Sequence, residues 1–438
     1  MAVSVNVIGA GLAGCEAAWQ LAQAGIETRL YEMKPVKYSP AHHYSGFAEL
    51  VCSNSLKASR LDSAAGLLKA EMKAMGSLII PCAEQTQVEA GGALAVDRKK
   101  FSDMITEKIT SDPLITVVSE EVEEIPEGYV IIATGPLTSG PLAKSISDAC
   151  GSYLSFFDAA APIVSYDSLD KEKIFFASRY DKGDADYINC PMNKEEYENF
   201  YNELINAQTA QLKEFDKEAF KVYEGCMPVE VLAGRGEDTM RFGPLKPVGL
   251  IDKRTGKRPY AVVQLRKENK EGTMYNLVGF QTNLRFGEQK RVFSLIPGLE
   301  NAEFLRYGVM HRNSFINSPA LLKPTYEMRE RPGVFFAGQI TGVEGYIESA
   351  ASGIMAGKNM ALKIKSQPEL ILPCETMTGA LSAYISDSYN NGSFQPMGCN
   401  MGILPELPER IRDKKVKYEK YAERSLDKLA QTLGGVKL

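Results

Sequence analysis

The chain has 438 residues, of which 44% are hydrophobic and 24% charged, so it is long enough to bury two cores and we expect two domains. Its formal net charge of −5 excludes the uniformly basic composition of small nucleic-acid-binding proteins. No apolar run approaches the roughly 18 residues of a membrane span, and residues 3–8 read as a strand rather than a signal segment. We therefore expect a cytoplasmic protein without a membrane partner.

Cysteine and histidine usage limits the metal and disulfide chemistry. The eight cysteines lie far apart in the sequence, which fits neither a disulfide framework nor paired metal ligands, and there are only three histidines. We expect no metal site and expect most thiols to be unreactive core residues.

Residues 3–32 predict a βαβ unit, with strands at 3–8 and 27–31 and a helix that ends at Gly25. A helix is expected at 96–105, a strand at 115–118 and a buried strand at 130–135. From about 150 to 320 the rhythm changes to short strands, turns and one amphipathic helical stretch at 194–221. The α/β character returns at 333–338 and in a helix at 347–365, and a charged helix at 408–433 ends the chain.

The turn after the first strand has the spacing of a dinucleotide-binding fingerprint. It comprises Gly9, Ala10, Gly11, Leu12, Ala13 and Gly14. The first glycine makes the tight turn, the second admits a pyrophosphate and the third lets helix and strand pack closely. The helix N-terminus then binds the phosphates, and Glu32, at the end of the second strand, is placed to bind ribose hydroxyls.

Two distant segments favour FAD over NAD. The strand that ends at Gly135 and the segment that ends at Gly338 and Gln339 resemble the second and C-terminal fingerprints of two-dinucleotide flavoproteins. In that class an Asp usually follows the last glycine, so Gln339 implies a different polar contact. Ile347, which follows in the expected helix, completes the cofactor residues that we expect. The alternative for each segment is a buried strand and turn.

These patterns predict an α/β fold. We expect a Rossmann-like, two-dinucleotide-type FAD-binding domain made from residues 1–150 and 321–438, with an inserted α+β domain at 151–320.

Five segments, found at residues 45–57, 224–230, 241–249, 283–290 and 338–353, are similar to the folate- and FAD-dependent tRNA (uracil-5-)-methyltransferases. The resemblance covers nearly the whole chain. It implies transfer of the methylene of 5,10-methylenetetrahydrofolate to C5 of a uridine, expected at position 54 in the tRNA T-loop, with reduction by FADH2. NADPH or NADH would re-reduce the flavin. The related tRNA wobble-uridine carboxymethylaminomethyl flavoproteins share the FAD segments but are longer and lack these cysteine contexts.

The implied chemistry needs two reactive groups. Uracil C5 becomes nucleophilic once a thiolate adds to C6, and a second group must later remove the C5 proton. Cys226 lies in a Gly-Cys-Met-Pro turn and Cys52 in a Val-Cys-Ser-Asn-Ser segment, and loops of this kind commonly hold reactive groups. The resemblance assigns Cys226 as the nucleophile and Cys52 as the flavin-side general base, and the two roles could be exchanged.

Folate has a flat pterin and an acidic tail, so its site should offer stacking and a basic group. The candidates are Asn283, Arg285 and Tyr346, with His311 as a further one. A tyrosine in Gly-Tyr-Ile-Glu could equally be ordinary packing.

Positive charge is concentrated in two segments that are the expected RNA contacts. Residues 246–270 contain eight basic side chains against two acidic ones, a local net charge of +6, and a second basic run lies at 410–417. Such residues act mainly on phosphates, although a charge run is usually only a solvated face. The target base would have to leave its loop to reach the flavin. Two alternatives stay open: the same chemistry on 23S ribosomal RNA, and a flavin-binding RNA chaperone or sensor without methyl transfer.

Overall fold

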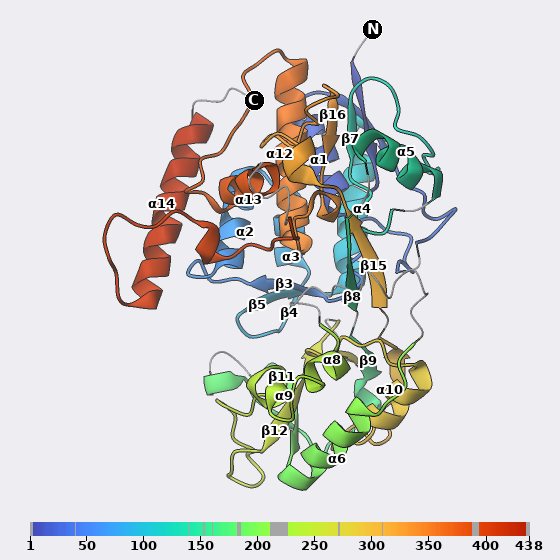
Figure 1. Cartoon of the computed structure of the whole chain (residues 1–438), viewed down its shortest axis with the longest axis vertical. Coiled ribbons are helices and arrows are strands. Elements are labelled where there is room, and N and C mark those ends of the chain that lie inside the picture. Colours follow the sequence, from blue (N-terminus) through green and yellow to red (C-terminus); the bar gives the residue numbers. More distant parts are fainter. Residues whose placement is uncertain are drawn as a thin grey trace.

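The computed structural model describes residues 3–39, 41–138, 140–151, 154–159, 161–181, 185–210, 227–269, 272–308, 310–387 and 394–434, without the side chains of 154–159, 181 and 310–312. Figure 1 shows two bodies, one built from both ends of the chain and one from its middle. Each body has its own large hydrophobic core. No helix in these ranges is both long and apolar enough to cross a membrane.

A five-stranded parallel sheet organises the first body, in the order β16-β7-β1-β2-β6. The strands are β1 (Ser4–Ile8), β2 (Glu27–Tyr31), β6 (Ile115–Val118), β7 (Val130–Ile132) and β16 (Val334–Phe336). Each lies within a segment that the sequence predicts as a strand. β7 and β16 are buried throughout, and their continuous apolar runs are typical of strands covered on both faces. β16 enters beside β7 although the whole second body separates them in the chain, so the chain's two ends form one sheet.

Helices α1 (Leu12–Gln23) and α12 (Tyr346–Ile364) pack against each other over much of their length. Their contact depends on glycine, because a Cβ atom on Gly353 would lie 2.2 Å from the Ala13 carbonyl oxygen. One on Gly357 would lie 2.8 Å from the Ala17 carbonyl oxygen. The bounds of α12 agree with the helix predicted at 347–365.

Further helices and a small antiparallel sheet complete the first body. They are α2 (Ala64–Ala74), α3 (Ile79–Gln85), α4 (Arg98–Ser111), α5 (Gly140–Cys150), α11 (Ser318–Leu321), α13 (Met377–Ser386), α14 (Lys414–Gly434), β3 (Ser55–Ala58), β4 (Gln87–Val88) and β5 (Ala93–Val96). The last helix begins at Lys414 rather than at residue 408, because Asp413 accepts a hydrogen bond from the Val416 amide at 2.9 Å and so caps it there.

The second body contains a six-stranded antiparallel sheet in the order β10-β11-β12-β13-β9-β14. Its elements are β9 (Ile163–Ser165), β10 (Phe175–Phe176), β11 (Tyr187–Met192), α6 (Lys194–Ile205), α8 (Val229–Ala233), α9 (Thr239–Phe242), β12 (Ala261–Lys267), β13 (Met274–Leu277), α10 (Phe286–Phe293) and β14 (Phe304–Arg306). The chain leaves and re-enters the first body through the antiparallel pair β8 (Leu154–Ala159) and β15 (Met310–Phe315), which runs between the two bodies in Figure 1.

The amphipathic stretch at 194–221 is only partly helical. Asn193 and Glu196 form a capping box that starts α6 at Lys194, as predicted. The helix ends at Ile205, and the last eleven residues of the predicted stretch lie outside the described residues.

Candidate active site

The turn between β1 and α1 is built as a dinucleotide fingerprint requires. Gly9 has a φ of +98°, and a Cβ atom there would lie 2.7 Å from the Ala133 carbonyl oxygen. A Cβ atom on Gly14 would lie 1.8 Å from the Gly9 carbonyl oxygen. Gly11 differs, since no atom of the described residues lies within 4 Å of its Cβ position, and it faces a cavity. Gly9 and Gly14 therefore shape the turn, and Gly11 leaves room for a ligand.

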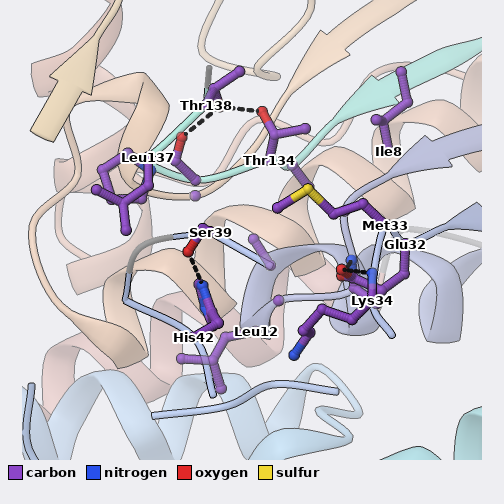
Figure 2. Close-up of a pocket in the computed structure, with 18 of the residues that line it drawn as sticks. Ile8, Leu12, Glu32, Met33, Lys34, Ser39, His42, Thr134, Leu137 and Thr138 are labelled. Carbon is purple, nitrogen blue, oxygen red and sulfur yellow. Dashed lines mark hydrogen bonds between the residues drawn. The ribbon is translucent and has the colours of Figure 1, made fainter. Parts of the chain in front are cut away.

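Glu32 lies at the end of β2 and lines the same cavity. Its Oε2 atom accepts a hydrogen bond from the Ala10 amide at 2.9 Å, and its Oε1 atom accepts one from the Lys34 amide at 3.0 Å. Figure 2 shows the carboxylate held by these backbone contacts. The fixed carboxylate is oriented as an acceptor for ribose hydroxyls.

The opposite wall of the cavity comes from the loop after β7. Thr138 Oγ1 lies within hydrogen-bond distance of Thr134 Oγ1, at 2.6 Å, and of the Gly135 carbonyl oxygen, at 2.9 Å, and these contacts close the loop on itself (Figure 2). Gly135 has a φ of +72°, a conformation that favours glycine.

The third wall is the segment after β16. Gly338 has a φ of +86°, and its amide donates to Ser352 Oγ at 2.7 Å. Gln339 lines the cavity, but its Nε2 atom donates to Glu344 Oε1 at 2.8 Å. Its position is therefore fixed by a neighbouring carboxylate.

These three walls enclose one cavity. Of the residues expected from the sequence, it is lined by Gly9, Ala10, Gly11, Leu12, Ala13, Glu32, Gly135, Gly338, Gln339 and Tyr346. A helix N-terminus, an open glycine position and a buried carboxylate suit the pyrophosphate and ribose of a dinucleotide. The residues present fit FAD, since the segments after β7 and β16 line the same cavity as the glycine turn and Glu32.

A loop after β2 adds residues that the sequence did not single out. His42 lines the cavity, and its Nδ1 atom lies 2.5 Å from Ser39 Oγ (Figure 2). Burial lowers the pKa of His42, so the ring is neutral near pH 7. Lys34 Nζ points away from solvent and donates to the Gly46 carbonyl oxygen at 2.6 Å. The one available signal was the presence of two of the chain's three histidines in this loop.

Tyr346 connects the cavity with Cys52. Its hydroxyl oxygen lies 2.9 Å from Cys52 Sγ and accepts hydrogen bonds from the amides of Cys52 at 2.8 Å and Ser53 at 3.3 Å. Burial and the negative charge of a Cys52 thiolate raise the pKa of Tyr346 well above its usual value. The phenol therefore stays protonated, and because two amides already face its oxygen, its proton is free to point at the sulfur.

Three arginines hold the loop around Cys52. Arg98, from α4, and Arg306, from β14, donate to the Val51 carbonyl oxygen at 3.2 and 2.9 Å. Arg266, from β12, donates to Ser53 Oγ at 2.6 Å. Two of the three come from the second body, so both bodies are needed to build this loop.

The arginine cluster carries more positive than negative charge. Among the described residues, Glu268 is the one carboxylate in a salt bridge with it, at 2.7 Å from Arg98 Nε. Burial and the charge of Arg98 lower the pKa of Arg306 to about 10, and burial lowers that of Arg266. Both remain cationic near pH 7. This surplus of charge stabilises an anion such as a thiolate.

Of the other expected site residues that the structure describes, Ile347, Asn283 and Arg285 do not line the cavity. Ile347 is buried in the first turn of α12, and Asn283 and Arg285 lie before α10 in the second body, where they bind neighbouring chain. His311 is on β15, with its side chain outside the described residues. Cys226 also lies outside the described residues.

The sequence matches known proteins along nearly its whole length. Residues 4–368 match the family model described as glucose inhibited division protein A. The methylenetetrahydrofolate–tRNA-(uracil-5-)-methyltransferase TrmFO of Acetivibrio thermocellus is 62% identical over 424 residues, which cover 96% of this chain and 97% of that protein. The protein of the same name from Brevibacillus brevis is 59% identical over 425 residues, or 97% of both chains. The chain belongs to the TrmFO family.

Membership of the TrmFO family confirms the resemblance drawn from the sequence. A solved structure of GidA from Aquifex aeolicus superposes with a TM-score of 0.68 at 16% identity, covering 98% of this chain and 74% of that one. At this identity the likeness concerns the fold, and it confirms the Rossmann-like α/β class. In this TrmFO family member the cofactor cavity and the Cys52 loop meet at Tyr346.

Proposed function

We propose that this chain is a methyltransferase that forms 5-methyluridine in tRNA, at position 54 of the T-loop, with 5,10-methylenetetrahydrofolate as the methylene donor. The relatives that carry the name of this activity span the full length of the chain. The observation that carries the proposal is that Tyr346 both lines the dinucleotide cavity and contacts Cys52 at 2.9 Å. When bound, FAD supplies the reducing equivalents that convert the transferred methylene to methyl, and NADPH or NADH renews them.

Cys52 is the proposed general base. A thiolate at this position accepts the proton that C5 of uracil loses after it has bonded to the methylene carbon. The support is the neighbourhood of Cys52, in which the Tyr346 hydroxyl can donate to the sulfur and three arginines lie around the loop. Cys226 is the proposed nucleophile that adds to C6 and makes C5 nucleophilic, a role that still rests on the family resemblance.

The RNA is proposed to lie along the second body and the start of α14. The exposed basic residues of the segment at 246–270, and those of the run at 410–417, would hold its phosphates. The uridine would then be turned out of its loop towards the Cys52 side of the cavity.

Methylation of purified RNA tests the proposal. The FAD-loaded protein is incubated with undermodified tRNA, methylenetetrahydrofolate and NADPH, and 5-methyluridine is measured by nucleoside mass spectrometry. We expect product only when folate is present. Cys52→Ala and Cys226→Ala should lose product while retaining FAD, and Cys374→Ala, at an exposed cysteine, is the control. If 5-methyluridine formed only in 23S ribosomal RNA, the substrate would be that RNA instead of tRNA. Binding of tRNA without any product would favour the sensor alternative.

A further inference from the structure

A second pocket lies on the second body, outside the dinucleotide site. It is formed by α9 and by the chain before β12, both of which Figure 1 places away from the parallel sheet. Its principal lining residues are Arg241, Phe242, Lys246, Val248, Arg258 and Tyr260. Three cations and two aromatic rings thus line one pocket, and none of the described residues that line it is acidic. The segment at 241–249 carries part of the family resemblance, yet the proposed catalysis uses none of it.

The pocket wall is held in place by its own contacts. The Arg241 guanidinium lies 3.6 Å from the centre of the Tyr260 ring, and its Nε atom donates to the Tyr260 carbonyl oxygen at 3.1 Å. Arg241 Nη1 also contacts Asp238 at 2.6 Å. Behind the wall, Arg179 Nη1 donates to the Val248 carbonyl oxygen at 2.9 Å. Both the stacked pair and the loop at residue 248 are therefore fixed before any ligand arrives.

Two features of the pocket suit a ligand: cations that have no acidic partner among the described residues, and an exposed aromatic ring. Lys246 and Arg258 are exposed and form no ion pair within the described part of the chain. Phe242 is 82% exposed although it is a large apolar side chain. Unpaired cations attract an anion, and an exposed ring offers a face for stacking a planar group. A nucleotide combines a phosphate with a planar base, and it satisfies both features at once.

We propose that this pocket binds one nucleotide of the RNA substrate, other than the uridine that reacts. The base stacks on Phe242, and its phosphate is held by Lys246 and Arg258. The proposal rests on the proposed function for the identity of the RNA. The exposed lysines Lys253 and Lys257 of the same segment continue the contact along the backbone.

Direct binding of RNA tests this pocket without turnover. Affinity of the full-length, FAD-loaded protein for an unmodified tRNA transcript is measured by fluorescence anisotropy at several salt concentrations, with folate absent. Phe242→Ala should weaken binding roughly ten-fold with little change in salt dependence, because base stacking is lost. The double variant Lys246→Ala/Arg258→Ala should weaken binding and reduce the slope of log Kd against log salt by roughly one to two.

Matched controls come from the same segment. Ile251 is apolar and 61% exposed but does not line the pocket, and Lys253 and Lys257 are exposed lysines outside it. Ile251→Ala should leave tRNA affinity unchanged. Lys253→Ala/Lys257→Ala should weaken tRNA binding less than Lys246→Ala/Arg258→Ala does. Near-UV circular dichroism and flavin absorbance check that every variant is folded.

Two results would contradict the proposal that this pocket binds a nucleotide of the RNA. Equal losses in the pocket variants and in their controls would show a diffuse basic face with no nucleotide site. Unchanged tRNA affinity together with weakened NADPH binding would assign the pocket to a dinucleotide instead. Neither result depends on methyl transfer, so a protein that makes 5-methyluridine with unaffected pocket variants keeps its proposed function and loses only the pocket.

Discussion

The hydroxyl of Tyr346 lies 2.9 Å from the sulfur of Cys52, although 294 residues separate the two in the chain. The same oxygen accepts the Cys52 amide, so the tyrosine fixes both the backbone and the side chain of this residue. Because the Tyr346 side chain also lines the cofactor cavity, the thiol cannot move without disturbing the cavity wall. The contact couples cofactor site and thiol through one side chain.

Replacement of Tyr346 by Phe should make Cys52 less reactive. The phenol has a raised pKa, so it is a hydrogen-bond donor throughout the physiological range, and its loss removes a donor that stabilises the thiolate. We expect the pH midpoint of Cys52 alkylation to rise and methyl transfer to slow roughly ten-fold, while FAD remains bound. Iodoacetamide labelling followed by mass spectrometry measures the midpoint. Tyr384→Phe, whose hydroxyl donates to a carbonyl elsewhere in the first body, is the control; a midpoint unchanged in Tyr346→Phe would contradict the role.

Arg306 should stabilise the Cys52 thiolate by charge. Its pKa is lowered to about 10, so it is cationic up to that pH, and it donates to the carbonyl oxygen next to Cys52. Arg306→Met should raise the alkylation midpoint of Cys52 by roughly one pH unit, as expected for the loss of a nearby opposite charge. Arg291→Met, at an exposed arginine paired with glutamates in α10 and α6, should leave it unchanged. A similar shift in both variants would point to a general effect of net charge.

The elements that have a local signal were predicted well. The strand bounds 27–31 and 115–118 coincide with β2 and β6. β2 begins just after the turn at Gly25, and β6 is the largely β-branched run Ile-Thr-Val-Val. The start of α6 follows from the Asn193 cap, but its end does not, since the helical pattern of the sequence continues past Ile205. The dinucleotide cradle was also predictable, because the glycines act on their own backbone.

The surroundings of Cys52 could not be predicted. Arg98, Arg266 and Arg306 come from three elements in two bodies, and no spacing in the sequence relates them. Asn283 and Arg285, the expected folate residues, belong to a motif that the sequence does reveal. In the fold, however, neither residue lines the cofactor cavity. Convergence of distant side chains is decided by tertiary packing and leaves no local pattern.

Glu16 should make stability depend on pH. Its carboxylate is buried at the start of α3, where it accepts hydrogen bonds from the amides of Leu78 and Ile79 at 3.0 Å each and one from the Ser77 hydroxyl. Burial raises its pKa from 4.5 to about 7, against the opposing effect of these hydrogen bonds. The folded state therefore holds the proton more tightly than the unfolded state. The resulting stability is fully present below about pH 4.5 and is lost as the pH rises through about 7, by about 3 kcal/mol.

Urea unfolding at pH 5, 6, 7 and 8 measures this effect. The unfolding free energy of the unaltered protein should fall across the series relative to that of Glu16→Gln, which has no carboxyl group to titrate. Glu195→Gln, at an exposed position on α6, should follow the unaltered protein. Parallel pH profiles for the unaltered protein and Glu16→Gln would show that the carboxylate stays ionised in the folded state.

Gly353→Ala should disturb the cofactor site indirectly, by pushing α12 away from α1. A Cβ atom at this position would lie 2.2 Å from the Ala13 carbonyl oxygen and 2.8 Å from Ala13 Cα, so α1 and α12 must move apart. Overpacking of this kind costs roughly 1–3 kcal/mol. Because the displaced turn of α1 directly follows the glycine turn at Gly9, we also expect FAD affinity to fall. Thermal unfolding and flavin release measured by fluorescence report the two effects.

Gly287→Ala is the matched control, since Gly287 lies in α10 and, in the part of the chain that the structure describes, no atom outside its own helix turn lies within 4 Å of its Cβ position. Alanine there should leave FAD binding unchanged and raise stability by roughly 0.5–1 kcal/mol, the difference between the two residues in a helix. The contrast separates steric overlap from the general effect of adding a methyl group to a helical glycine. If Gly353→Ala instead bound FAD and unfolded like the unaltered protein, α1 and α12 would have to lie further apart than the 2.2 Å approach to the Ala13 carbonyl oxygen indicates.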